Sequence, residues 1–563
     1  SETKAQIYGN GTPIAYCGIL TLVLTELFLL SKKIKIQEKI LTIVFIVIMI
    51  LIMNNKLLNL IFHGLKETTG YPYRYAFCLS FLLILTALRT GNYIKEIEVP
   101  KLVSIFLINL LIGIFMLMQN YKFIETQYIT ISMIIAATYI VTILIDKKIN
   151  IMPIIGLLLC IELLINYTFT FKELEDDEAK INTYMSSYAE FKDPVKEIID
   201  NDKEFYRMEK TSNFYLNDSI MLNYKGISHS SSTFDKNVSD LLKKIGYSYY
   251  MDWPSYGRGN TIITDMLFNI KYKISNYEDE EYFKNERTYG KHHLLKNEKH
   301  LPLGFISDGY IKQLEEQLKS PFETQNKILN NLTNSNENYF KDVEVKKIKY
   351  NNLNKINENE YQRKDESSNI ELEINEIDNK NIYFYINTNY ELDNPAFKIY
   401  VNNEFYDDYA GAAKNGILNI NNKHKVNNIK IYFMTNEKID IKKIQIKAID
   451  QKEFETAYTK IHQSASNIKY KNETLTMDVN ANKDGYLNIM ISNEYSWQIK
   501  IDDKIVKQLP DSEFISVKIN QGQHKIVMQY KLKGHKIGIL LLVLSVIALI
   551  TLNVYTIKRK KKS

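Results

Sequence analysis

The chain has 563 residues, with 71 Lys and Arg against 65 Asp and Glu, which gives a formal net charge of +6. This length predicts several domains, and a net charge of this size says little about nucleic-acid binding. The three cysteines all lie in apolar segments, which argues against a disulfide-rich secreted protein and suits a bacterial cell surface.

Long apolar runs predict a chain that crosses a membrane several times. A helix needs about 20 apolar residues to span a bilayer. Six such runs lie within residues 1–169 and a seventh lies near the carboxyl terminus, whereas residues 170–535 are polar. The fold class is therefore a polytopic α-helical membrane domain with a large water-soluble insert before its last helix. The predicted spans are roughly 12–31, 38–55, 74–91, 101–118, 127–145, 150–168 and 537–557.

Basic residues at the ends of these spans predict their orientation. Fourteen Lys and Arg flank one side of the predicted membrane and five flank the other, alternating through every span. Because basic residues accumulate in short cytoplasmic loops, we expect the richer side to be cytoplasmic. It carries the clusters at 32–39, 89–101, 147–148 and 558–562. The insert and the loop before residue 75 are then extracytoplasmic.

The first part of the insert, residues 170–340, is predicted to be an α/β domain. It mixes helical patterns, at 235–245 and 310–318, with short strand-like runs such as IKYKIS at 270–275.

The second part of the insert is predicted to form two β-sandwich modules, at 341–455 and 456–535. Apolar and polar residues alternate there with period two in many short runs, which is typical of strands with one buried face. Residues 351–368 are polar and aperiodic, so we expect a loop there. The last predicted region, 536–563, is a final helix with a basic cytoplasmic tail.

A polar cluster lies just before the third predicted span. It consists of His63, Glu67, Tyr71, Tyr73 and Arg74. The planar guanidinium of an arginine at an outer helix end suits a phosphate, because it binds two oxygens at once. The tyrosines could stack on a sugar, and the histidine could donate to a phosphate or move a proton. The alternative is that Arg and Tyr only anchor the helix at the interface.

A carboxylate, Glu162, lies inside the sixth predicted span, with Asn166 one turn further on the same face. Charged side chains in a membrane are costly and usually face a cavity or a partner. The alternative is a structural hydrogen bond between helices. Glu26 lies near the cytoplasmic end of its span, where it could reach the interface.

Asp252, Trp253 and Arg258 stand in the polar and aromatic stretch MDWPSYGRGN of the insert. Rings that cover a sugar face and side chains that bind hydroxyls make such a stretch a candidate carbohydrate surface. The alternative is a Trp in the protein core. The histidines of the insert lack the spacing of metal ligands, so no cofactor is evident and a divalent metal is left open.

Several separated motifs resemble the YfhO family of bacterial membrane proteins. The match involves His63-Gly64, the run Pro72–Tyr75, and Glu162 with Asn166. It continues through the insert, in LFNIKYKIS, LPLGF, PFE and YSW, and through GQHKI before the last helix. The resemblance spans essentially the whole chain.

This resemblance implies a polytopic glycosyltransferase of the GT-C class in the bacterial cell membrane. Its donor would be a polyprenyl-phosphate-linked sugar, and its acceptor a cell-envelope glycopolymer, teichoic or lipoteichoic acid. The implied catalytic residues are His63, Arg74 and Glu162. The candidate substrate-binding residues, from the patterns described above, are Glu67, Tyr71, Tyr73, Asn166, Asp252, Trp253 and Arg258. Membrane lipid is expected as a partner and nucleic acid is not.

Two other functions fit the same sequence. One is a non-catalytic envelope protein whose insert binds polysaccharide, and the other is a transporter of lipid-linked precursors. The chain begins with Ser1 and without an export signal, so we expect it to be the carboxyl-terminal part of a longer polypeptide. In the GT-C class the catalytic carboxylate lies in the first outer loop, which would precede this chain.

Overall fold

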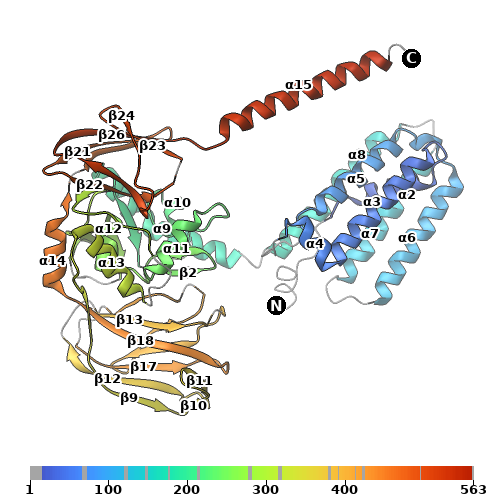
Figure 1. Cartoon of the computed structure of the whole chain (residues 1–563). Coiled ribbons are helices and arrows are strands. Elements are labelled where there is room, and N and C mark those ends of the chain that lie inside the picture. Colours follow the sequence, from blue (N-terminus) through green and yellow to red (C-terminus); the bar gives the residue numbers. More distant parts are fainter. Residues whose placement is uncertain are drawn as a thin grey trace. The chain divides into compact units, whose positions relative to one another are not determined.

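The computed structural model forms two compact units, Ser1–Ile181 and Asn182–Ser563 (Figure 1), which we call the helical unit and the sheet unit. The structure describes residues 15–65, 73–119, 125–145, 150–174, 178–211, 216–276, 282–314, 320–377, 382–390, 392–412, 414–420, 425–463, 465–494 and 496–560.

The helical unit consists of apolar helices joined by short connections. Four of its helices are long and apolar enough to cross a membrane, as is the last helix of the sheet unit, α15. Two others, of 12 and 16 residues, are apolar but shorter. The helices are α2 (Ile19–Leu30), α3 (Ile36–Asn54), α4 (Lys56–Phe62), α5 (Ala76–Gly91), α6 (Val99–Gln119), α7 (Thr126–Leu144), α8 (Met152–Leu174) and α15 (His535–Lys560).

The first predicted span, 12–31, is only partly helical. Residues 15–18 have no regular structure, and α2 begins at Ile19. The physical reason is Gly18, whose φ of 91° is incompatible with an α-helix. Non-helical backbone inside an apolar bundle is tolerated only where protein or a cavity covers its polar groups.

The helical unit has a core of its own around α2. This helix packs against α5, α6 and α7, and the side chains of Val23, Ile105 and Tyr139 are fully buried between them. The long helices α3 and α6 leave most of their side chains exposed, as expected of helices that face lipid.

The predicted orientation can be tested by cysteine labelling in intact cells, with the three native cysteines replaced by Ser. We expect Ser367→Cys, on an exposed turn of the insert, to react with an impermeant maleimide. We expect Ser563→Cys, beside the basic tail, to react only after the cells are opened, because basic flanks stay in the cytoplasm. The reverse pattern would contradict the orientation.

The sheet unit begins with α9 (Glu178–Asn201) and a four-stranded sheet of order β1-β4-β6-β5. The strand predicted at 270–275 is β4 itself, and the helix predicted at 235–245 is α11. The helix predicted at 310–318 is wrong for residues 310–314, which are not helical. The elements are β1 (Arg207–Lys210), β4 (Ile270–Ser275), β5 (Phe283–Tyr289), β6 (His292–Asn297), α10 (Asp218–Met221), α11 (Lys236–Lys244), α12 (Ile262–Leu267) and α13 (Pro321–Thr333).

Two further sheets form a β-sandwich between residues 340 and 449. Their orders are β10-β11-β18-β13-β16 and β15-β14-β17-β12-β9, and they enclose one apolar core. The loop predicted at 351–368 contains two strands, β10 and β11, because β11 pairs with β18 in spite of its polar sequence. The strands are β8 (Phe340–Asp342), β9 (Val345–Asn351), β10 (Leu353–Lys355), β11 (Glu360–Arg363), β12 (Asn369–Ile377), β13 (Ile382–Thr388), β14 (Phe397–Val401), β15 (Glu404–Tyr409), β16 (Leu418–Ile420), β17 (Val426–Phe433) and β18 (Ile439–Ile449).

The last strands of the chain pair with a strand of the α/β part. This pairing crosses the domain boundaries predicted at residues 340/341 and 455/456. The strand β7 (Gly304–Ser307) pairs with β22 and with β19, which lie far along the chain. A second sheet has the order β20-β21-β26-β23-β24. The elements are α14 (Gln451–Lys460), β19 (His462–Gln463), β20 (Ala465–Lys471), β21 (Thr474–Ala481), β22 (Gly485–Ser492), β23 (Trp497–Ile501), β24 (Lys504–Val506), β25 (Phe514–Ile519) and β26 (Gly522–Tyr530).

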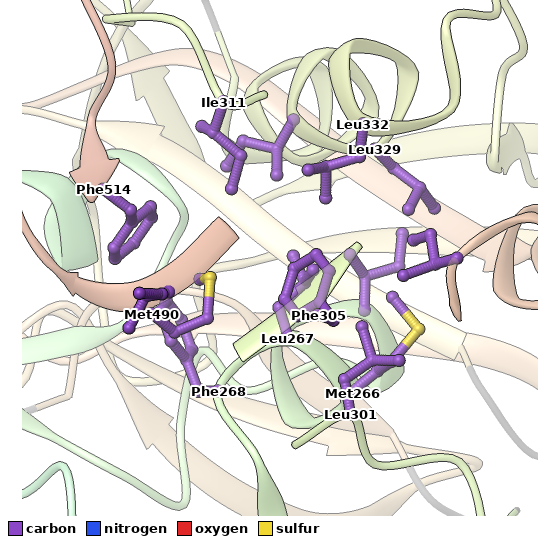
Figure 2. Close-up of a cluster of buried hydrophobic side chains, with 14 of the residues drawn as sticks. Met266, Leu267, Phe268, Leu301, Phe305, Ile311, Leu329, Leu332, Met490 and Phe514 are labelled. Carbon is purple, nitrogen blue, oxygen red and sulfur yellow. The ribbon is translucent and has the colours of Figure 1, made fainter. Parts of the chain in front are cut away.

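One apolar core joins these last strands to the α/β part of the unit. In Figure 2, Phe305 of β7 lies among side chains of α12 and α13, and Met490 and Phe514 come from β22 and β25. Phe305, Leu329 and Met266 are completely buried. The two parts of the sheet unit therefore share one interior.

This shared core predicts how fragments of the sheet unit will fold. We expect residues 182–533 to form a soluble β-rich protein with a cooperative thermal transition. Residues 456–533 alone should remain unfolded, because they lose β7 and the apolar side chains of α12 and α13. Circular dichroism of the two fragments tests this, and cooperative melting of the short fragment would contradict it.

Candidate functional site

The buried carboxylate of the helical unit is Glu162, on α8, which is only 2% exposed. Its Oε1 accepts hydrogen bonds from the backbone N–H of Ile19 at 2.6 Å and from the hydroxyl of Tyr16 at 3.0 Å. Its Oε2 accepts from the hydroxyl of Tyr139, on α7, at 2.8 Å. The carboxylate therefore joins three segments that are distant in the sequence.

The carboxylate of Glu162, on α8, lies at the amino end of α2, which is an electrostatically favourable position. The first N–H groups of a helix have no partner within the helix and carry partial positive charge. Gly18 lies beside the carboxylate, and a Cβ there would meet Oε1 at 3.5 Å. The glycine that ends the non-helical segment thus turns the beginning of α2 toward Glu162.

A cavity of about 260 Å³ opens beside this carboxylate. Asn166 lines it one turn along α8 from Glu162, as the spacing in the sequence predicts. Its other lining includes Tyr16, Tyr128, Ser132, Ile135 and Phe169. One end of the cavity is therefore polar, and its walls are mainly apolar.

A second cavity of about 250 Å³ shares Ile19, Tyr128 and Ser132 with the first. Its remaining lining is mostly apolar and comes from α2, α6 and α7. The two cavities are mainly apolar, with polar side chains that include Glu162 and Asn166 in the first. We call the two cavities together the helix groove.

A polar pair that the sequence analysis did not identify lies near the second cavity. Asn109, on α6, lines that cavity and donates to Oε2 of Glu26 at 2.6 Å. Glu26 is therefore hydrogen-bonded to a neighbouring helix. An Asn in the middle of the apolar run 101–118 was the signal that could have identified the pair.

His63 and Arg74 lie at the connection between α4 and α5. His63 caps the carboxyl end of α4, and its ring lies 5.5 Å from that of Tyr75, whose hydroxyl donates to Asn59 at 2.8 Å. Tyr73 and Arg74 form the turn that begins α5, with Arg74 exposed. Glu67 and Tyr71 lie outside the described residues. Of the described residues of this cluster, neither His63, Tyr73 nor Arg74 lines the helix groove.

The candidate residues of the sheet unit bind neighbouring segments. The indole N–H of Trp253 donates to the carbonyl of Ser231 at 2.9 Å, and Asp252 pairs with Lys243 at 2.6 Å. Trp253 is half-buried.

Arg258 joins the α/β part to the β-sandwich. Its Nη1 donates to the carbonyls of Asp408 at 2.7 Å and Lys414 at 3.3 Å, and its Nη2 pairs with Asp407. These contacts occupy the guanidinium that the sequence analysis assigned to substrate.

Within the described ranges, no group of three or more His, Cys, Asp or Glu side chains is arranged to hold a metal ion.

Comparison with known proteins gives one clear result. The family model described as bacterial membrane protein YfhO matches residues 3–542, which is nearly the whole chain. No curated protein matches the chain.

Proposed function

Because this chain belongs to the YfhO family of bacterial membrane proteins, we propose that it acts as a membrane glycosyltransferase. In this proposal it moves a sugar from a polyprenyl-phosphate carrier to a cell-envelope polymer, teichoic or lipoteichoic acid. The family match over both units supports this assignment, and the expected cell-membrane location fits the five helices that could span a bilayer.

The observation that carries the proposal is the helix groove. A polyprenyl phosphate has a long apolar tail and a polar head, and the groove offers apolar walls with a polar end at Glu162 and Asn166. The tail would replace lipid along α2, α6 and α7. The polar head would pass the amide of Asn166 and the hydroxyl of Ser132, and its phosphate would lie outside the groove, because Arg74 does not line the groove.

In the proposed mechanism, Arg74 binds the phosphate that leaves the sugar. A guanidinium stabilises the charge that develops on this phosphate through two parallel hydrogen bonds. His63, at the end of α4, and Tyr73 would add donors near it. Glu162 holds the start of α2 through Ile19 and Tyr16, so its part in this proposal is to position the groove.

The direct test is sugar transfer in proteoliposomes. The protein would be reconstituted with a radiolabelled polyprenyl-phosphate hexose and with lipoteichoic acid. We expect label in the polymer at a rate well above that of protein-free liposomes. Equal labelling with and without the protein, for each hexose tested, would contradict the proposal.

A transporter of lipid-linked precursors remains the second candidate. The observation in its favour is the amino end of α2, which lies inside the bundle at Glu162, because transporters often place the amino ends of helices at their substrate site. The same proteoliposomes separate the two functions. Transport would bring the labelled lipid to the other leaflet without forming a new glycosidic bond.

A further inference from the structure

We propose that one face of the last sheet binds the anionic phospholipid headgroups of the membrane that α15 enters. Four lysines define this basic face: Lys469, Lys471, Lys500 and Lys531. They lie on β20, on β23 and just after β26, toward the end of the sheet from which the chain leaves for α15. The inference does not depend on sugar transfer, because it concerns only the sheet unit and the lipid around its last helix.

The chain passes from the sheet to α15 through a very short segment. The backbone N–H of Tyr530 donates to the carbonyl of Glu473 at 2.9 Å. The backbone N–H of Lys531 donates to the carbonyl of Ser496 at 2.7 Å, so the sheet holds the chain up to that residue. α15 begins at His535, and four residue steps span at most about 14 Å. Since the headgroup layer of a bilayer is about 5–8 Å thick, the end of the sheet lies close to the headgroups.

The antiparallel register places a polar row at this end of the sheet. Lys471 lies opposite Thr474, on β21, which lies opposite Gln529, on β26. Gln529 in turn lies opposite Gln498, on β23. The Nζ of Lys531 donates to Oε1 of Gln498, beside the same row. Four strands at a spacing of about 4.8 Å make the row about 14 Å wide, enough to meet several headgroups.

The next row adds two lysines and an exposed apolar side chain. Its members lie opposite one another across five strands in the order Lys469, Thr476, Val527, Lys500 and Ile505. Ile505 is 64% exposed. Neither row contains a carboxylate, so the face combines positive charge with an apolar group that could enter the interface.

Neighbouring acids do not neutralise the basic face. None of its four lysines forms an ion pair with a described residue. Asp478 lies one row further, opposite Lys525. Glu473 lies in the turn between β20 and β21, and Glu494 accepts from the hydroxyl of Tyr530 at 3.0 Å. The two rows nearest the membrane helix therefore keep their positive charge.

The positive charge continues into the membrane helix. Lys533 lies in the connection, next to Leu532, which is 61% exposed, and Lys536 lies in the first turn of α15. Lysines clustered beside a membrane helix attract anionic lipid. The basic face extends this cluster from the helix onto the folded sheet.

Protection of a sheet edge is another role for exposed lysines, because they keep an edge strand from pairing with another chain. This role accounts for Lys469 and Lys471, since β20 is an edge strand. It does not account for Lys500, on the interior strand β23, or for Lys531, beyond the end of β26. These two positions favour binding to the adjacent membrane.

The test measures contact with lipid in nanodiscs that hold one copy of the protein. The three native cysteines are replaced by Ser, and a fluorescent dye is attached to an Ile505→Cys variant. We expect acrylamide, a neutral quencher, to quench this dye about threefold less efficiently when phosphatidylglycerol replaces part of the phosphatidylcholine. Salt at about 1 M, which shortens the Debye length to about 3 Å, should remove this protection.

Two charge variants and a second dye position make the test specific. Lys471→Glu with Lys531→Glu should abolish the protection and leave the protein monodisperse, because both side chains are exposed. The matched control, Lys346→Glu with Lys347→Glu, makes the same charge change on the edge strand β9 and should keep the protection. A dye on Ser367→Cys, on an exposed turn of the β-sandwich, should be quenched equally with both lipids.

Four outcomes would overturn the basic face as a lipid site. The first two are equal protection in phosphatidylcholine alone and unchanged protection in the Lys471 and Lys531 variant. The third is loss of protection in the β9 variant. The fourth is protection by soluble polyphosphate in phosphatidylcholine nanodiscs, which would assign the face to a soluble polyanion. No arm measures sugar transfer, so the result leaves the transferase proposal untouched.

Discussion

Replacing Arg74 by Ala should reduce sugar transfer by about a hundredfold while membrane insertion stays normal. The guanidinium is exposed at the start of α5, where a carrier phosphate at the predicted outer membrane face would meet it. Loss of a charge-assisted contact to the leaving phosphate removes about 3 kcal/mol of transition-state stabilisation. The rate of polymer labelling in proteoliposomes measures this effect directly.

Two variants make the test of Arg74 specific. Arg74→Lys should restore activity only in part, because a point charge cannot form the two parallel hydrogen bonds of a guanidinium. Arg89→Ala removes an exposed arginine from the other end of the same helix, where it contacts Glu38 at 3.4 Å, and should leave transfer unchanged. Normal sugar transfer by the Arg74→Ala variant at wild-type expression would contradict this role. His63 would then be the next candidate for binding the leaving phosphate.

Replacing Glu162 by Leu should destabilise the helical unit by about 3 kcal/mol or more. Three donors, from Ile19, Tyr16 and Tyr139, would be left buried without an acceptor, and each costs about 1–3 kcal/mol. We expect the detergent-solubilised variant to lose its monodisperse peak in size-exclusion chromatography after mild heating that leaves the wild type intact.

The Glu162→Gln variant distinguishes a positioning role of this side chain from a direct catalytic role. The amide oxygen can still accept from Ile19 and Tyr16, and its NH₂ can donate to the hydroxyl of Tyr139. This variant should keep most of the stability and most of the transfer activity. Loss of transfer by a stable Gln variant would instead assign Glu162 a direct catalytic role. Glu125→Leu, which changes an exposed acid of the same unit, is the control for the loss of charge.

The sequence predicted those parts of the fold that follow from local pattern. Apolar length identified the long helices, and the strand-like run IKYKIS predicted β4 at 270–275. The tetrapeptide GFIS of β7 is too short for any period, so its pairing with β22 required the three-dimensional fold. The polar stretch 351–368 formed strands because a neighbouring strand supplied hydrogen bonds.

The candidate site likewise has features that follow from local sequence pattern and features that depend on the three-dimensional fold. The spacing of Glu162 and Asn166 correctly placed both on one face of α8. The partners of Glu162 could not be read from the sequence, because Tyr16 lies 146 residues away and belongs to a segment that looked helical. The start of α2 at Ile19, later than the predicted span, depended on Gly18 and the nearby carboxylate together.

The pairing of β7 with β22 has a consequence for the biogenesis of the protein. The partner of β7 is synthesised almost 180 residues later, which takes about 10–40 s at a rate of about 5–20 residues per second. During that interval the apolar side chains of α12 and the unpaired edges of β7 emerge without the strands that cover them. Folding of the sheet unit must therefore wait until β25 is synthesised, shortly before α15. A holding chaperone that shields this intermediate would set the yield of folded protein.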